Sequence, residues 1–325
     1  MNSFGRIFRI SIFGESHGHC VGITIDGCPC GIPLKEEDFI KDMDRRRSGI
    51  QGTTKRLEPD SVEIWNGVYD GYTTGSPITA IVCNTNTNPK DYSLFKHVPR
   101  PGHADFTGQK KYHSFNDMRG GGHFSGRVAL GLVIAGVIAK KILKEIHFIS
   151  TILSVGGSQN ISQKIEETLQ EKDSVGGLVE CRIQGCPIGW GEPFFDSIES
   201  SISHLVFAIP AIRGIEFGEG FLSASRKGSE HNDAFIDQNG KTLTNHCGGI
   251  NGGITNGNEI LFRVAVKPPS SIAKSQHTFD FQKNAMTDLV VEGRHDACIA
   301  LRIPVIIEAA AAIALADFSL LRGHS

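Results

Sequence analysis

Two segments of the chain, residues 127–146 and 304–321, predict helices that are apolar on more than one face. Ser125 stands before the first helix as an N-cap, and Pro304 stands in the first turn of the second, where a helix tolerates proline. A helix that is apolar all round must be buried on every side. The longest apolar stretch without a charge, residues 128–139, is shorter than the roughly 18–20 residues that cross a membrane. We therefore expect two helices at the centre of the fold and no membrane partner.

Segments with strand character dominate the first third of the chain, at residues 7–13, 21–25, 62–68 and 78–83. A glycine-rich turn at residues 70–75 lies between the last two and is typical of a hairpin. Shorter helices are expected at residues 35–43 and 196–208. No proline-rich linker or charge block divides the chain, so we expect residues 1–325 to form a single domain.

A weak internal sequence similarity is found before the two long helices. Gly122-His123 opens the region of the first, and Arg294-His295 leads toward the second. This similarity predicts an internal pseudo-repeat, which would fit a sandwich fold built from two similar halves.

The charge balance narrows the classes of partner. The chain has 33 Lys and Arg against 35 Asp and Glu, a net charge of −2. A general nucleic-acid or membrane-surface binder would show a basic excess, so we expect neither partner. Arg6 and Arg9 interrupt the apolar residues at the N-terminus, which is not the pattern of a secretory signal. The eight cysteines are therefore expected to be reduced thiols in a cytoplasmic protein.

The sequence motifs of several common functional sites are absent, and one short motif, that of a nucleophile elbow, is present. The sequence has no G-x-G-x-x-G dinucleotide fingerprint, no C-x-x-C pair and no H-E-x-x-H motif. Histidines such as His19 and His113 lie in turns, so no metal site is expected. Residues 14–18 match the G-x-S-x-G nucleophile elbow, which would make Ser16 the nucleophile of a hydrolase. An elbow sits on a central strand, whereas only thirteen residues precede Gly14. The serine hydrolase remains an alternative.

Cationic residues recur in five separate segments, four of which also contain glycine. They are residues 45–56, 100–105, 119–127, 267–271 and 293–296. Arginine supplies paired donors to phosphate and carboxylate, and successive glycines expose backbone N–H groups to an anion. The glycine excess, 38 of 325 residues or about 12% against an average of about 7%, points the same way. These segments predict a pocket for a phosphorylated small molecule, either in an enzyme or in a non-catalytic flavin- or phospholigand-binding module.

Six motifs in this order resemble the chorismate synthase family. They are Phe-Gly-Glu-Ser-His-Gly at 13–18, Asp-Arg-Arg-Arg at 44–47, Arg-Pro-Gly-His-Ala-Asp at 100–105, Arg-Gly-Gly-Gly at 119–122, Lys-Pro-Pro-Ser-Ser at 267–271 and Gly-Arg-His-Asp at 293–296. The resemblance implies a lyase that converts 5-enolpyruvylshikimate 3-phosphate to chorismate by 1,4-elimination of phosphate. It also implies reduced FMN as cofactor, a homotetramer, and an α+β fold in which a β-sandwich of antiparallel sheets is wrapped by helices.

The resemblance also implies roles for individual residues. His17 is similar to the histidine that protonates the departing phosphate, His103 to the one that interacts with the flavin, and Asp296 to the acid that works with the flavin N5. Ser16, Arg46, Arg100 and Arg127 match substrate-binding positions. FMN-binding positions are matched by His123, Phe124, Ser125, Ala211, Gly252, Lys267, Pro268, Pro269, Ser270, Ser271 and Arg294.

Two features bear on the flavin. Relatives often carry Arg-Ser where this chain has His123-Phe124, and a loop arginine near Gly52 is missing. Because no Rossmann fingerprint is present for NADPH, we expect an external partner to reduce the flavin.

Overall fold

The first sheet comes from the N-terminal quarter of the chain. It is antiparallel throughout, in the order β1-β2-β3-β7-β4, with strands β1 (Ser3–Phe4), β2 (Arg9–Gly14), β3 (Cys20–Asp26), β7 (Ile78–Cys83) and β4 (Glu63–Asn66). A small hairpin of β5 (Val68–Tyr69) and β6 (Tyr72–Thr73) turns the chain between β4 and β7. The strands and the glycine-rich turn predicted from the sequence are confirmed. This computed structural model describes residues 1–54, 56–87, 89–291, 293 and 295–323.

The second sheet comes from residues 147–266 and is also antiparallel. Its order is β10-β13-β9-β8, with strands β10 (Ile212–Phe217), β13 (Ile260–Val266), β9 (Gly177–Gln184) and β8 (His147–Val155). Alternate residues of β13 are buried, as expected of a strand with one face on a core. Two hairpins lie outside this sheet, β11 (Ile250–Asn251) with β12 (Ile254–Thr255), and β14 (Gln276–Asp280) with β15 (Ala285–Leu289).

Seven α-helices connect or separate these sheets in the part of the chain that the structure describes. They are α1 (Ile40–Arg46), α2 (Asp105–Lys111), α3 (Leu130–Ile142), α4 (Ile161–Gln170), α5 (Ile198–Phe207), α6 (Gly228–His231) and α7 (Pro304–Arg322). Short 3₁₀ turns lie immediately before three of them, η1 (Glu36–Phe39) before α1, η4 (Gly126–Ala129) before α3 and η7 (Ile299–Arg302) before α7, and η5 (Phe194–Asp196) lies just before α5. The four helices predicted from the sequence are confirmed.

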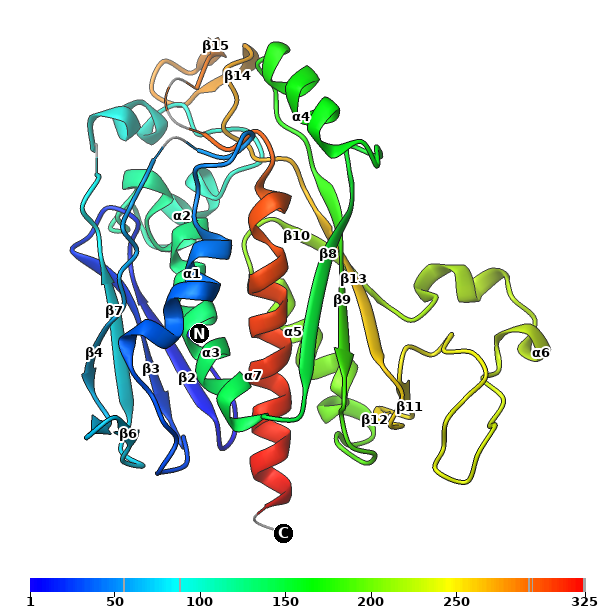
Figure 1. The fold of residues 1–325 in the computed structure, drawn as a ribbon. Helices are drawn as coiled ribbons and strands as arrows, with labels where there is room; N and C mark the ends of the chain where they lie inside the picture. Colours follow the sequence, from blue (N-terminus) through cyan, green and yellow to red (C-terminus); the bar gives the residue numbers. More distant parts are fainter. Residues whose placement is uncertain (55, 88, 292, 294, 324–325) are drawn as a thin grey trace.

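Helices α3 and α7 form the centre of the molecule, between the two sheets (Figure 1). Residues 130–139 of α3 and residues 305–318 of α7 are all buried. The two helices approach closely at Gly136, where a Cβ atom would lie 2.3 Å from the Cβ of Ala309. The segment Arg119–Ile142, which ends in α3, and helix α7 are each long and apolar enough to cross a membrane, but 78% and 72% of their apolar windows are buried inside the protein. This burial is typical of core helices.

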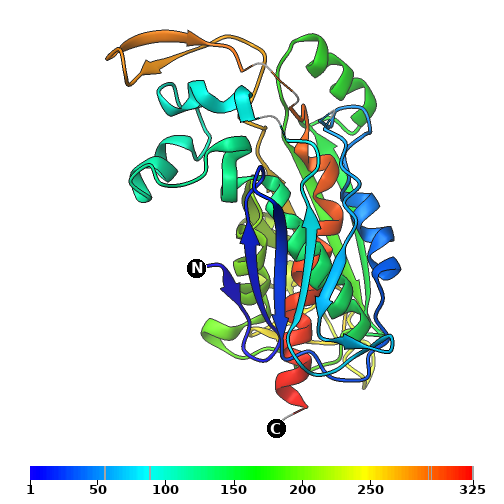
Figure 2. The ribbon, with the colours of Figure 1, turned by 90° about the vertical axis from the view of Figure 1, so that its left-hand side faces the viewer.

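The α+β class with antiparallel sheets is confirmed, with a more specific order of layers than expected. The sheets do not stack on each other with all helices outside. Instead α3 packs on the first sheet and α7 on the second, because helices that are apolar all round need cover on every side. Figure 2 shows the first sheet in front of α7 and the hairpin β14–β15 projecting beyond it. Each half of the chain supplies one sheet and then one central helix, the order that the pseudo-repeat requires; the repeat itself stays a prediction.

Candidate active site

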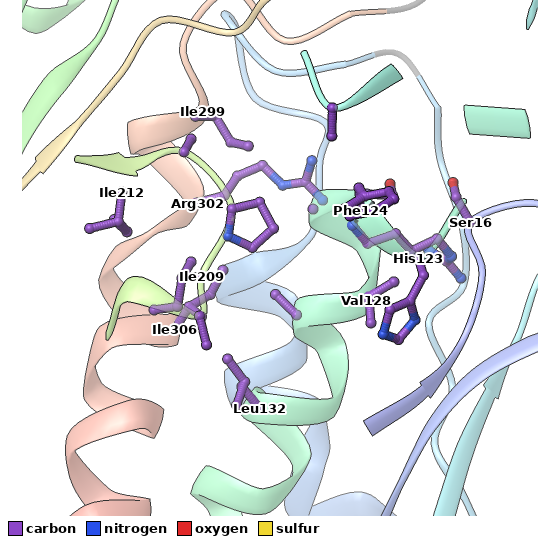
Figure 3. A pocket seen from close by; sticks show the side chains of 18 of the residues that line it. Ser16, His123, Phe124, Val128, Leu132, Ile209, Ile212, Ile299, Arg302 and Ile306 are labelled. Carbon is purple, nitrogen blue, oxygen red and sulfur yellow. Dashed lines mark hydrogen bonds between the residues drawn. The ribbon is translucent and has the colours of Figure 1, made fainter. Parts of the chain in front are cut away.

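A cavity of about 670 Å³ lies where α3 and α7 begin (Figure 3). This volume is typical of small-molecule sites. Its wall brings together segments that are far apart in the sequence. Fourteen of the predicted site residues line it, namely Ser16, Arg46, Arg100, His103, His123, Phe124, Ser125, Arg127, Ala211, Lys267, Pro269, Ser270, Ser271 and Asp296.

The glycine run 120–122 lets two histidines approach the cavity wall. All three glycines have positive φ, at 61°, 81° and 54°. A Cβ atom on Gly120 would lie 2.2 Å from His17 Nδ1, and one on Gly121 would lie 3.3 Å from the ring of His103. The run is tied to the first sheet because the Ser16 N–H donates to the Gly122 carbonyl at 3.1 Å. Glycine is therefore required here for close approach as well as for backbone conformation.

Replacing Gly120 by alanine should abolish most of the activity of the protein, because the new methyl group must displace the His17 ring. We expect turnover to fall by at least about 100-fold, since small displacements of reacting groups have effects of that size. The matched control is Gly228→Ala, at a position with no atom within 4 Å of the added Cβ. Steady-state turnover of both variants checks this prediction, and equal activity would contradict it.

Arg46 and Arg127 share one buried carboxylate at the base of the cavity. Asp60 Oδ1 lies 2.9 Å from Arg127 Nη1, and Asp60 Oδ2 lies 3.4 Å from Arg46 Nη1. All three side chains are buried. Arg127 Nε also donates to Asn84, and Arg46 Nη2 donates to the Gly126 carbonyl at 3.0 Å. Two guanidiniums with a single carboxylate leave a net positive charge that an anion can balance.

Arg56 holds Ser16 at the rim of this cluster. Its Nη1 donates to Ser16 Oγ and its Nη2 to the Ser16 carbonyl, both at 3.1 Å, and Glu58 pairs with the same guanidinium at 2.7 Å. Burial acts to raise the pKa of Glu58, but hydrogen bonds from Thr85 and Arg56 outweigh it and lower the pKa to about 2. Arg56 belongs to a cationic segment of the sequence but was not singled out there, because the sequence does not show which cations of a loop face inward.

Arg100 and His103 form a second cluster on the cavity wall. Arg100 donates two hydrogen bonds to the Asp105 carboxylate, from Nε at 2.7 Å and from Nη2 at 2.8 Å. Its Nη1 donates to Ser271 Oγ at 2.9 Å. His103 Nδ1 lies 2.7 Å from Asp105 Oδ1. Burial acts to raise the pKa of Asp105, but hydrogen bonds from Arg100 and His103 outweigh it and hold the pKa well below its usual range. Asp105 therefore orients both the arginine and the imidazole.

Lys267 adds a further cation from the segment after β13. Its Nζ donates to Ser270 Oγ at 2.8 Å, and that hydroxyl donates to the Gly102 carbonyl at 2.8 Å. Burial and the nearby Arg213 lower the pKa of Lys267. Two cations held close together favour an anion beside them.

His123 and Ser125 connect the first sheet with the start of α3. His123 Nδ1 lies 2.8 Å from the Gly14 carbonyl. Ser125 Oγ accepts from the Arg127 N–H, so the predicted cap is confirmed. Part of the wall is apolar, with Val128 and Leu132 on one side and Ile209, Ile212, Ile299 and Ile306 on the other (Figure 3).

Three predicted site residues that the structure describes are not on the cavity wall. His17 follows the lining residue Ser16 in the sequence but does not line the cavity itself. Its Nδ1 lies 3.2 Å from Ser16 Oγ, and its ring is edge-on to Tyr92. Pro268 lies next to two lining residues but does not line the cavity itself. Gly252 is in the turn between β11 and β12, at the other end of the second sheet, so this chain does not bring it to the cavity (Figure 1). Arg294 lies outside the described residues.

The cavity carries an excess of positive charge. Among the described residues that line it, seven are cationic, Arg46, Arg56, Arg100, Arg127, Arg213, Lys267 and Arg302, and three are carboxylates, Glu58, Asp60 and Asp296. In the same part of the chain, no group of three or more His, Cys, Asp or Glu side chains is arranged to hold a metal ion. Ser16 is followed by β3 of an antiparallel sheet and accepts from Arg56, which is not the setting of a nucleophile elbow. The serine hydrolase is therefore not favoured.

Fold and site define an α+β protein with a cavity in which cationic side chains outnumber carboxylates, a lining suited to a polyanionic small molecule. A sequence model of the chorismate synthase family matches residues 8–320. The chain is 58% identical to the chorismate synthase of Chitinophaga pinensis, covering 100% of this chain and 98% of that one. It is 42% identical to the enzyme of Dehalococcoides mccartyi and 40% identical to that of Methanocaldococcus jannaschii, in both cases over 99% of this chain and 97% of the relative.

A solved crystal structure of a chorismate synthase superposes with a TM-score of 0.77 at 27% identity, covering 98% of this chain and 93% of the other. The chain belongs to the chorismate synthase family, and so to the lyases of aromatic amino-acid biosynthesis.

Proposed function

We propose that this chain converts 5-enolpyruvylshikimate 3-phosphate to chorismate by 1,4-elimination of phosphate. The observation that carries the proposal is the gathering of seven cationic side chains in one cavity with His103, and with His17 directly behind the wall. The substrate has one phosphate and two carboxylates, and arginine forks bind both groups with paired hydrogen bonds. Such a cavity suits a reaction in which negative charge develops on a departing phosphate.

We infer that the phosphate departs on the side of Arg46, Arg127 and Ser16. Arg46 and Arg127 share Asp60, and cations outnumber carboxylates among the described residues that line the cavity, so an added phosphate would meet an excess of positive charge there. Ser16 Oγ lines the cavity and lies 3.2 Å from His17 Nδ1, so a proton of His17 can reach the leaving group through this hydroxyl. Asp296 lines the cavity as well, which suits the removal of a substrate proton.

The residues present fit reduced FMN as the cofactor. The apolar wall around Val128, Leu132 and Ile209 can face a flat ring system, and Lys267 with Arg213 can hold a phosphate tail. Reduced FMN supplies electron density that stabilises the electron-poor allylic system as phosphate leaves. His103, oriented by Asp105, can hold a proton near this ring. This chain has His123-Phe124 at the positions where relatives often carry Arg-Ser. The His123 ring nitrogen Nδ1 is within hydrogen-bonding distance of the Gly14 carbonyl.

Anaerobic incubation of the protein with chemically reduced FMN and 5-enolpyruvylshikimate 3-phosphate tests the proposal. We expect chorismate to appear, as measured by its absorbance. Binding of FMN without any product would instead support the non-catalytic module. Absence of both product and FMN binding would contradict the whole assignment.

We further propose that the chain acts as one domain of 1–325 in a cytoplasmic homotetramer. A single apolar core joins both sheets through α3 and α7, which supports one domain. Several aromatic side chains are 75–91% exposed, which supports an interface with further copies; they are Phe194, Phe195, Phe221 and Phe235. The phosphorylated substrate remains the expected small-molecule partner, with no nucleic acid and no membrane.

An external reductase is the other partner that we propose. With NADPH and FMN in place of chemically reduced FMN, the protein alone should form no chorismate, because the chain has no G-x-G-x-x-G fingerprint. Addition of a separate NADPH-dependent flavin reductase should restore turnover. Turnover by the protein alone with NADPH would show that it reduces its own flavin, and the external partner would then be unnecessary.

A further inference from the structure

Arg302 lines the cavity but has no role in the function proposed so far. It is the last residue of η7, directly before α7, and its side chain is 12% exposed. Figure 3 shows this side chain reaching from the start of α7 into the cavity. A guanidinium in such a place either binds a ligand or holds other side chains in position.

The first group that Arg302 holds is the carboxylate of Asp296. Arg302 Nη1 lies 3.4 Å from both Asp296 oxygens, and the Thr54 N–H donates to Oδ1 at 2.9 Å. The carboxylate is therefore fixed from two sides. The loop of Thr54 is itself joined to the loop of Asp296, because the Gly52 carbonyl accepts from the Ala297 and Cys298 N–H groups at 2.9 and 3.0 Å.

The second group is the C-terminal end of α1. Arg302 Nε donates to the carbonyl of Arg46, the last residue of this helix, at 2.9 Å. The last carbonyls of a helix lack partners within it, and a cation at this end is favourable. A helix of seven residues is also too short to be stable alone, so its position depends on such contacts.

The position of α1 matters because Arg46 reaches into the cavity from its last turn. Arg46 is 3% exposed, and its Nε has no hydrogen-bond partner among the described residues. Burial, followed by the nearby positive charge of Arg302, holds the pKa of Arg46 well below its ordinary value. An anion beside this guanidinium would satisfy the open donor and relieve the repulsion between the two cations.

We propose that Arg302 is a positioning residue, which fixes the Asp296 carboxylate and, through its bond to the end of α1, aims Arg46 at the anionic group of the substrate. The proposal rests on the proposed function and names one more residue of the same site. One guanidinium thus joins the end of α1 to the loop of Asp296, although Arg302 and Arg46 are 256 residues apart in the sequence.

The test compares Arg302→Ala and Arg302→Lys with the wild type. Arg9→Ala, which removes an exposed arginine of β2, is the matched control. We expect Arg302→Ala to weaken the binding of inorganic phosphate about tenfold and to lower kcat about 100-fold, because Asp296 loses its charged partner and the end of α1, which carries Arg46, loses a hydrogen bond. Arg302→Lys keeps the charge but lacks the fork, so phosphate affinity should change little while kcat falls about tenfold. Added guanidinium ion should restore part of the kcat of Arg302→Ala.

Calorimetric titration with inorganic phosphate gives a readout that does not depend on turnover. If the wild type forms no chorismate, the proposed function fails, and the phosphate affinities alone then decide on Arg302. Equal affinity in the wild type and Arg302→Ala overturns the proposal. It is also overturned if Arg302→Lys loses as much as Arg302→Ala and guanidinium restores nothing, since that pattern would indicate packing only.

Discussion

Replacing His17 by alanine should lower the turnover of the protein about 1,000-fold and leave its affinity for FMN largely unchanged. The expected size is that of a lost general acid. His17 Nδ1 is close to Ser16 Oγ, on the side of the cavity where Arg46 and Arg127 meet, and it is shielded from solvent by Gly120 and Tyr92. The alanine variant therefore lacks the group that would donate a proton to the departing phosphate. It keeps the apolar wall that would face FMN.

Steady-state turnover and FMN titration of the same protein samples check this result. His147→Ala is the matched control, because His147 is exposed at the start of β8. A variant that turned over normally would remove His17 from the reaction. A variant that lost FMN binding instead would place His17 in the cofactor site.

Replacing Asp60 by asparagine should destabilise the fold and weaken substrate binding together. Asp60 is the one carboxylate shared by the buried Arg46 and Arg127, so its removal leaves two buried guanidiniums close together without their counter-ion. Removal of one member of a buried ion pair costs about 3–5 kcal/mol. Asp60 has a φ of 49°, and asparagine tolerates this conformation, so the effect reports on charge and not on backbone strain.

The free energy of unfolding in urea and the substrate KM measure the two effects. Asp196→Asn is the control, because Asp196 forms an exposed ion pair with Arg6 that should contribute less than about 1 kcal/mol. If Asp60→Asn were as stable as this control and kept its KM, the cluster of Arg46, Asp60 and Arg127 would not be the anion site.

Local patterns in the sequence predicted much of this fold. The strands of the first sheet are short apolar runs bounded by turns, and the central helices are too apolar to lie anywhere but in the core. Both features depend on neighbouring residues only. The position of the helices between the sheets was not predicted, because it depends on which element covers each apolar face.

The candidate site was also predicted only in part from the sequence. The cationic and glycine-rich segments contain five of the seven cationic side chains on the described cavity wall, since such segments are recognisable within a few residues. The partners of those cations were not predicted. Asp60 with Arg127, and Arg302 with Arg46, are joined across 67 and 256 residues, and nothing in the sequence pairs them. For the same reason the sequence could not show that His17 lies behind Ser16 and not on the wall.

The most direct test of the account is the stoichiometry of the reaction under anaerobic conditions with reduced FMN. The central claim is that this cavity eliminates phosphate from 5-enolpyruvylshikimate 3-phosphate with no net oxidation of the flavin. Phosphate and chorismate should therefore form in equal molar amounts over many turnovers, while the absorbance of reduced FMN is the same at the end as at the start. Phosphate release without chorismate, or oxidation of one flavin for each product formed, would contradict the claim.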